Sequence, residues 1–332
     1  MNVHCFVGAE WPQLAGFEQE PALAPFDITL LDRQHAEAHL VATRAGRITA
    51  RCSCWVRAAP PCPAAQPGII GHFAAVDESA ATAVLVAAEN FLRHAGCSLA
   101  IGPMDGNTWR RYRWVTEQGD EPPFFMEPVN PPEYPLWWEH AGFEPLTRYQ
   151  SALITELSGR DERMERVRAR LHDEGVVIRP LDPLQFESDL RHMFTVSLTS
   201  FARNFLYTPL AEADFFAQYV PYRDKIRPEF VLLALQGATC VGFAFCSPDF
   251  LRRPVGGPSD TLILKTLAVL PGRAYAGLGN LFVELVHRAA HAAGMTRVIH
   301  ALSAAQNSVI NITARYGRVM RRYTLFSHPL QA

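Results

Sequence analysis

The sequence of 332 residues has no large excess of either charge and no apolar run long enough to cross a bilayer. Lys and Arg together number 31 and Asp and Glu number 33, which leaves a formal net charge of −2. Nucleic-acid-binding and membrane-surface proteins are usually rich in basic residues, so we expect neither kind of partner. The N-terminal segment lacks a basic start and a long apolar stretch, so we expect no signal peptide and a cytoplasmic location.

Cysteine occurs only seven times and at irregular spacing, which is a poor basis for a disulfide framework and fits a reducing compartment. Cys52 and Cys54 fall on one face of a predicted strand. With Cys62 and His72 they offer zinc-ligand chemistry, but their spacing matches no standard zinc finger or ribbon. We therefore interpret the two cysteines as small buried hydrophobic residues and expect no metal.

One order of predicted elements is used twice. In each half, two apolar β-branched runs around a turn precede a buried strand and then an amphipathic helix that ends at a glycine. The segments are 39–56, 68–76 and 84–95 with Gly96 in the first half, and 230–245, 260–270 and 278–293 with Gly294 in the second. We expect a mixed α/β (α+β) fold of two tandem domains, each a mostly antiparallel sheet flanked by helices.

A charged segment, 158–175, separates the halves and carries a thin apolar stripe. Its interspersed acids and bases predict a solvated linker helix between a first domain, 1–157, and a second domain, 176–332.

The first half also has an insertion rich in aromatic residues and arginine. Four of its residues are candidates to line a substrate groove: Trp109, Arg110, Tyr112 and Arg113. The alternative is a long loop packed on its own aromatic side chains.

The two halves differ most where the buried strand meets the helix. In the second half this connection is LPGRAYAGLGN (270–280), with Gly277 and Gly279 at the helix start, where free N–H groups and a partial positive charge favour an anion. It lacks the Gly-Lys-Ser/Thr of a Walker loop, and Phe282 occupies the third small position of a dinucleotide fingerprint. The first half has VDESAATAV instead, where Asp77 and Glu78 suit a helix cap and would repel a phosphate.

The second-half loop resembles the cofactor motif of the GNAT superfamily of acyl-CoA-dependent N-acyltransferases, which runs from Val-x-Pro through Gln/Arg-x-x-Gly-x-Gly/Ala into a helix. The matching residues are Val269, Pro271, Gly277, Leu278 and Gly279. Ala274 stands at the Gln/Arg position, and Arg273 lies one residue out of register. The later segment 307–315, Gly317 and RRYTLF also look like the family.

The resemblance implies that an acyl-CoA donates its acyl group to the amine of a small-molecule or amino-acid-type acceptor, with acetyl-CoA as the expected donor. The pyrophosphate would lie on the glycine loop, the pantetheine would pair with the strand backbone, and Asn307 would hydrogen-bond to the pantetheine. The implied cofactor-binding residues are Leu267, Ala268, Val269, Arg273, Ala274, Tyr275, Ala276, Gly277, Leu278, Gly279, Asn280 and Asn307.

The family's thiolate-protonating tyrosine corresponds to Thr313, so Tyr316 and Tyr323 are the nearby candidates for the general acid. His300 is the candidate for removing the amine proton. For all three side chains, packing is the competing interpretation.

Two other functions stay open. A non-catalytic acyl-CoA sensor or assembly module would explain Ala274 and Thr313. Aminoacyl transfer from aminoacyl-tRNA would need a basic groove, which the charge balance does not favour. A first half without the glycine loop would cover the acceptor site of the second half or hold together a homodimer.

Overall fold

The computed structural model describes residues 1–63, 65–252, 257, 259–304 and 317–331. In the first half the elements are β1 (Asn2–Phe6), η1 (Gly8–Gly16), β2 (Glu18–Gln19), α1 (Thr29–Arg33), β3 (Ala38–Arg44), β4 (Arg47–Trp55), β5 (Pro67–Ala75), α2 (Glu78–His94), β6 (Leu99–Gly102), β7 (Trp114–Glu117), α3 (Tyr134–His140) and β8 (Glu144–Ile154). In the second half they are α4 (Glu162–Asp173), β9 (Val176–Pro180), η2 (Pro183–Gln185), α5 (Phe186–Ser200), α6 (Glu212–Tyr219), η3 (Val220–Lys225), η4 (Pro228–Phe230), β10 (Val231–Gln236), β11 (Thr239–Pro248), β12 (Thr261–Val269), η5 (Arg273–Tyr275), α7 (Leu278–Ala292), β13 (Arg297–Ala304) and β14 (Arg318–Pro329).

The described strands form one mixed, mostly antiparallel sheet that joins the two halves. Its order is β1-β3-β4-β5-β6-β14-β8-β13-β12-β11-β10-β9, with β2 beside β4 and β7 beside β14. The mixed, helix-flanked architecture predicted from the sequence is confirmed. The division at 157 and 176 stays a prediction about domain boundaries.

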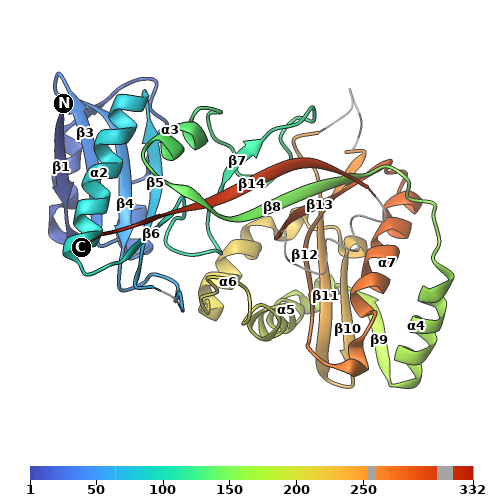
Figure 1. The fold of residues 1–332 in the computed structure, drawn as a ribbon. Helices are drawn as coiled ribbons and strands as arrows, with labels where there is room; N and C mark the ends of the chain where they lie inside the picture. Colours follow the sequence, from blue (N-terminus) through green and yellow to red (C-terminus); the bar gives the residue numbers. More distant parts are fainter. Residues whose placement is uncertain (64, 253–256, 258, 305–316, 332) are drawn as a thin grey trace.

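Each half completes its sheet with the last strand of the other. β14 of the second half pairs with β6 of the first, with Phe326 opposite Gly102. β8 of the first half pairs with β13 of the second, with Val298 opposite Ile154. β8 and β14 therefore run side by side across the middle of the molecule (Figure 1). This exchange fixes the two halves against each other by backbone hydrogen bonds.

Helix α2 covers one face of the first-half strands because its small and aliphatic residues recur at helical spacing. Val84, Ala88 and Leu92 are buried in the same cluster as Cys52 and Cys54 of β4. The two cysteines are thus small core residues, as predicted. The ring of His72 hydrogen-bonds to Ser53, whose side chain points to the opposite face of β4 from those of Cys52 and Cys54. His72 is therefore not part of the cysteine cluster.

The second half has helices on both faces of its strands. α4 and α7 cover one face, and α5 and α6 pack on the other. α4 lies within the predicted linker helix, but Met164 and Leu171 are buried against the core of the second half. The segment is therefore a packed part of that half rather than a solvated linker.

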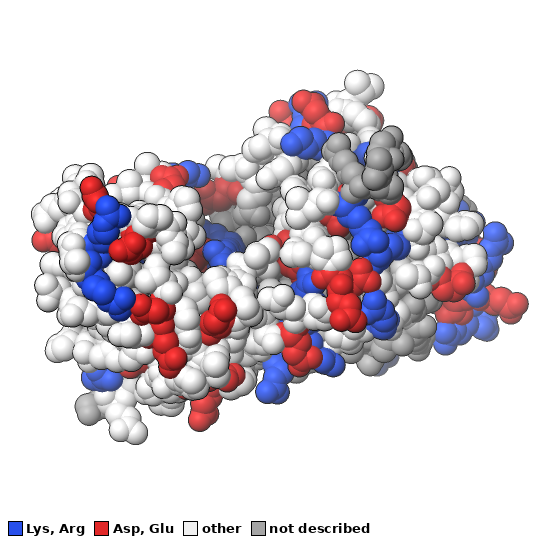
Figure 2. Space-filling model, turned by 90° about the horizontal axis from the view of Figure 1, so that it is seen from above, with Lys and Arg blue, Asp and Glu red and all other residues white. Residues whose placement is uncertain are grey.

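Acidic and basic side chains are interspersed over the face seen in Figure 2, and a hollow lies between the two lobes. Among the described residues, no helix combines the length and the apolar character that a bilayer span requires.

Candidate functional site

The glycine loop follows β12 and ends in the N-terminus of α7. Gly277, the residue that precedes the helix, has a left-handed backbone with φ of +84°. A Cβ atom there would lie 3.0 Å from the methyl groups of Val167 on α4, so both backbone and space require glycine. Within the described part of the chain, no side chain caps α7. The first N–H groups of this helix are therefore available to a ligand.

The corresponding end of α2 is already occupied. The Asp77 carboxylate accepts a 2.8 Å hydrogen bond from the backbone N–H of Ala80 and pairs with Arg44 at 2.8 Å. The hydrogen bond from Arg44 lowers the pKa of Asp77, so the carboxylate is charged at neutral pH. The predicted role of Asp77 as a helix cap is confirmed, and a phosphate at this position would meet a negative charge.

Strands β12 and β13 separate half-way along their length. Their parallel pairing runs from Thr261 with Arg297 to Leu264 with His300. Lys265 then forms a bulge in the pairing with β11, because Phe245 faces Thr266 while Cys246 faces Leu264. β13 pairs with β8 on its other edge both before and after this point, from Val298 to Ala304. The β12 edge after Leu264 has no strand partner among the described residues.

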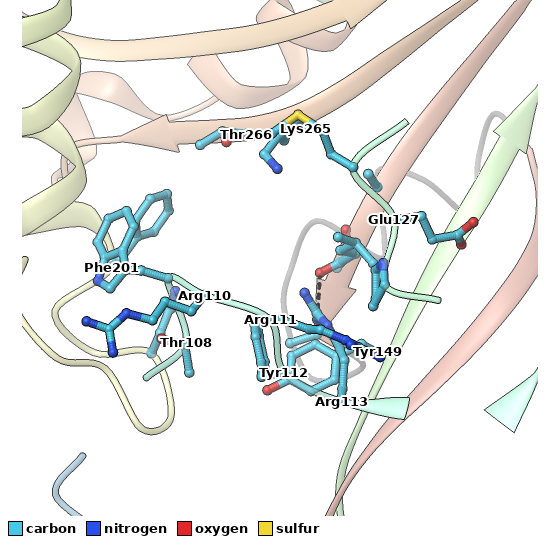
Figure 3. Close-up of a pocket in the computed structure, with 18 of the residues that line it drawn as sticks. Thr108, Arg110, Arg111, Tyr112, Arg113, Glu127, Tyr149, Phe201, Lys265 and Thr266 are labelled. Atoms are coloured by element: carbon cyan, nitrogen blue, oxygen red, sulfur yellow. Dashed lines mark hydrogen bonds between the residues drawn. The ribbon is translucent and has the colours of Figure 1, made fainter. Parts of the chain in front are cut away.

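A cavity of about 1180 Å³ opens where these strands separate. Both halves line it, so the first half covers a site on the second (Figure 3). The first half supplies Thr108–Arg113, Met126–Val129, Thr147 and Tyr149; the second supplies residues of α5 and α6, the 201–207 segment, 264–267 and 300–304. Trp109, Arg110, Tyr112 and Arg113 all line it, as the groove interpretation predicts. Its volume suits a sizeable ligand.

The cavity is basic, although the whole chain is not. The basic residues that line it are Arg110, Arg111, Arg113, Arg203 and Lys265. Glu127 is the acidic residue of the described lining, and its carboxylate is paired with Arg321 at 2.5 Å. Burial, and then the charge of Arg113, lowers the pKa of Lys265 to about 8. Net charge alone could not reveal this local concentration.

Known structures share the overall fold across nearly the whole chain. A tandem GNAT protein from the clavulanic acid biosynthesis pathway is 11% identical, with a TM-score of 0.50, and the alignment covers 100% of this chain and 99% of that one. Eis1 from Mycobacterium abscessus is 10% identical, with a TM-score of 0.51 over 99% of this chain and 74% of its own. A GCN5-related N-acetyltransferase from Anabaena variabilis is 11% identical, with a TM-score of 0.52 over 99% and 73%.

The chain has a tandem GNAT fold. No protein-family model matches it. A curated protein described as a bacterial ceramide synthase, from Caulobacter vibrioides, is 28% identical over 202 residues, which are 59% of this chain and 52% of that protein. The match thus spans about half the length of that relative.

Within this GNAT fold, the predicted cofactor residues of β12 have one edge without a strand partner among the described residues. Leu267, Ala268 and Val269 pair with β11 on one side, opposite Ala244, Phe243 and Gly242. On the other side this stretch borders the gap between the strands, and Leu267 lines the cavity. Of the remaining predicted residues, Arg273–Tyr275 form η5, Ala276 and Gly277 connect it to α7, and Leu278–Asn280 begin that helix. Asn307 lies outside the described residues.

The predicted catalytic residues are less well suited to their roles. His300 is buried on β13, and its Nε2 lies 3.0 Å from Nε2 of His287. Burial and then His287 lower its pKa to about 3, so the ring is a poor proton acceptor at neutral pH. The Tyr323 hydroxyl lies 3.0 Å from Ser151 Oγ and also bonds to Glu127, and burial raises its pKa. Tyr316 and Thr313 lie outside the described residues.

Lys265 is one of several cavity residues that the sequence interpretation missed, together with Arg111, Tyr149 and Arg203. The sequence did contain a signal for Lys265, because it is a charged residue inside the apolar run of the predicted strand 260–270. A lysine there breaks the apolar pattern of a buried strand and is costly to bury without a purpose.

Proposed function

We propose that this protein is an acyl-CoA-dependent N-acyltransferase, with acetyl-CoA as the simplest donor and a small-molecule or amino-acid-type amine as acceptor. The observation that carries the proposal is the order of three features along the chain. Among the described residues, the β12 edge after Leu264 has no strand partner, the N-terminus of α7 that follows has no side-chain cap, and β12 also lines the cavity that the first half covers.

Three stretches of the chain would each bind one part of the donor. The N–H groups at Gly277–Asn280 would bind the pyrophosphate. The edge of Leu267–Val269 would pair with the pantetheine as an added strand does. The thioester would then reach the cavity near Lys265 and Thr266. The role of Asn307 on the pantetheine arm stays a prediction, since this residue lies outside the described part of the chain.

In the reaction, the acceptor nitrogen forms a bond to the thioester carbonyl carbon and the carbon–sulfur bond breaks. The nitrogen loses one proton and the departing thiolate gains one, which gives an amide and CoA. The protein's contribution would be to hold the two reactants together in a covered cavity and to exclude water.

A small apolar pocket of about 40 Å³ adjoins Lys265 and supports a short acyl group. Its lining includes Phe125, Tyr222, Ile226, Phe245 and Phe250. The ceramide synthase relative supports amide formation, since a ceramide is a fatty-acid amide. It also makes long acyl chains and long-chain amines necessary members of any substrate test.

The test has two stages. Thermal unfolding is first measured with CoA, acetyl-CoA and palmitoyl-CoA, and a ligand at 100 times its Kd stabilises the folded protein by about 2.7 kcal/mol. Thiol release from each bound donor is then followed over a panel of short, acidic and long-chain amines. We expect a shift with CoA and amine-dependent release. No shift at millimolar cofactor contradicts the proposal.

A second candidate is a non-catalytic acyl-CoA sensor on the same fold. It is favoured by the engaged hydroxyl of Tyr323 and the low pKa of His300, which leave both predicted catalytic groups poorly suited to proton transfer. A CoA-dependent shift without thiol release from any amine would support the sensor.

A further inference from the structure

Arg113 is the most unusual charged residue of the cavity. It is only 5% exposed, and its guanidinium lies over the rings of Tyr112 and Tyr149, 4.1 and 4.2 Å from their centres. Its Nη1 donates a long, 3.4 Å hydrogen bond to the carbonyl of Leu302. Its Nε is buried and has no hydrogen-bond partner within the described chain.

No carboxylate of the described residues forms an ion pair with Arg113. Glu127, the acid of the lining, is engaged with Arg321 and Tyr323. Burying a guanidinium without a counter-charge costs free energy, so such a site is stable only when other interactions offset that cost. Cation–π contacts with two tyrosines offset part of it and also hold the guanidinium plane in one orientation.

The backbone around Arg113 is also unusual. Arg113 has φ of +69°, Leu302 has +61° and Met126 has +66°, and all three line the cavity. Left-handed backbone at residues with side chains costs energy and concentrates at functional sites. Three such residues around one cavity indicate a site built to hold side chains in fixed positions.

Lys265 supplies a second positive charge without an ion pair among the described residues. Figure 3 shows it with Thr266 on one wall of the cavity and the Arg111–Arg113 segment on the other. The two charges are close enough that Arg113 contributes to lowering the pKa of Lys265. Two like charges facing one cavity favour an anion between them.

These charges lie away from the proposed pyrophosphate site. The cavity lining includes residues 264–267 of β12 but none of 273–280 in the glycine loop. In the proposed binding mode, the thioester enters the cavity from the β12 side, near Thr266, whereas Arg113 lies on the opposite wall (Figure 3). A group that occupied the space beside Arg113 would therefore belong to the acceptor.

We propose that the acceptor carries an anionic group, a carboxylate or a phosphate, that binds between Arg113 and Lys265. Assigning this anion to the acceptor rests on the proposed function, but the anion site itself does not. It narrows the substrate class to amino acids and amino phosphates and disfavours simple amines. A planar, stacked guanidinium suits both anions, because its N–H groups match paired oxygens.

The test compares amines that differ only in the anion: 4-aminobutyrate with butylamine, and O-phosphoethanolamine with ethanolamine. Binding is measured by calorimetry with and without CoA. We expect the wild type to prefer the anionic member of each pair. Arg113→Gln and Lys265→Met should each weaken that member about 30-fold or more and leave the neutral member unchanged.

Arg148 gives the matched control, because it is exposed on β8 next to Tyr149 and does not line the cavity. Arg148→Gln should retain the preference. If Arg113→Gln does not fold, Arg113→Lys and Lys265→Met carry the test. Arg113→Lys keeps the charge but loses the planar donors, so it should recover part of the preference.

Equal binding of both members of each pair, or an unchanged preference in Lys265→Met and a folded Arg113 variant, overturns the proposal. Comparing CoA with pantetheine identifies the other source of an anion. If Arg113→Gln weakens the binding of CoA but not that of pantetheine, the cations bind the cofactor's phosphates and the proposal is also wrong. If the wild-type protein does not bind CoA, the proposed function is wrong instead. An Arg113-dependent preference for the anionic amine, measured without CoA, still supports the anion site.

Discussion

Arg170 on α4 donates a 2.8 Å hydrogen bond to the carbonyl oxygen of Ala274 in the glycine loop. Its other terminal nitrogen donates to the carbonyl of Ala276 at 2.6 Å. Ala274 stands where GNAT loops have Gln or Arg, so a guanidinium from a neighbouring helix reaches the same stretch of backbone. α4 therefore both supports the loop and brings a positive charge to it.

Arg170→Ala should weaken CoA binding about 10-fold, because two charge-assisted hydrogen bonds to the loop are lost. Calorimetric titration with CoA measures the effect. Arg170→Lys should recover part of the affinity, and kcat should stay within about three-fold. Arg168→Ala, on the exposed side of the same helix, is the control. Equal CoA affinity in Arg170→Ala and wild type would contradict the role of α4.

Gly277→Glu should abolish the thermal shift with CoA, because it adds a carboxylate at the proposed pyrophosphate site. Gly294→Glu is the matched control, since Gly294 also has a left-handed backbone and lies just beyond the other end of α7. Both variants should lose roughly 1–2 kcal/mol of stability from the backbone alone. Unchanged CoA binding in Gly277→Glu would refute the pyrophosphate site. Asp77→Ala should create no second CoA site.

Tyr323→Phe decides between structure and catalysis for this tyrosine. The hydroxyl bonds to Ser151 and Glu127 in a buried network, so its loss should reduce stability by about 1–3 kcal/mol. Denaturant midpoints measure that loss. We expect kcat to change less than about three-fold at saturating donor. A hundred-fold fall in kcat with little loss of stability would restore Tyr323 as the general acid.

Binding of the anionic acceptor should depend on Lys265. Its pKa is lowered to about 8, so the side chain is charged below that pH and neutral above it. Affinity for 4-aminobutyrate should therefore fall as pH rises from 7 to 9, and Lys265→Arg should remove the fall because arginine stays charged. The other titratable groups that line the cavity are Arg110, Arg111, Tyr112, Arg113, Glu127, Tyr149, Arg203, Tyr207, Tyr219 and His300. A flat profile in the wild type would contradict the prediction.

The buried pair of His287 and His300 should make the fold sensitive to acid. Burial lowers their pKa values to about 4 and about 3, against about 6.5 in the unfolded chain. The unfolded state binds more protons below pH 6.5, so stability is present above that pH and is lost as pH falls. At pH 5 the loss is on the order of 2 kcal/mol for each histidine.

Urea unfolding of the wild type and of His287→Gln/His300→Gln at pH 7.5 and pH 5 tests this dependence. The double variant should lose much less stability between the two pH values than the wild type does. The same loss in both proteins would mean that other groups cause the acid sensitivity.

Local signals in the sequence determined most of the element order. Apolar periodicity predicts α2 and α7, and Gly96 and Gly294 follow them with the positive φ expected of glycines that end helices. The contrast between Gly277 and Asp77 also reflects local chemistry, because a glycine leaves a helix N-terminus open and an aspartate caps it. Repetition of one order then predicted the doubled fold without any knowledge of contacts.

Only the tertiary structure decided how the halves join and what the cavity attracts. Pairing of β14 with β6 and of β8 with β13 is non-local, and no periodicity within a strand specifies its partner. Arg113 and Lys265 lie in different halves. A composition of 31 basic against 33 acidic residues gives no sign that their two charges lie in one cavity. Charge acts through distance and burial, so the fold alone turned these residues into one basic site.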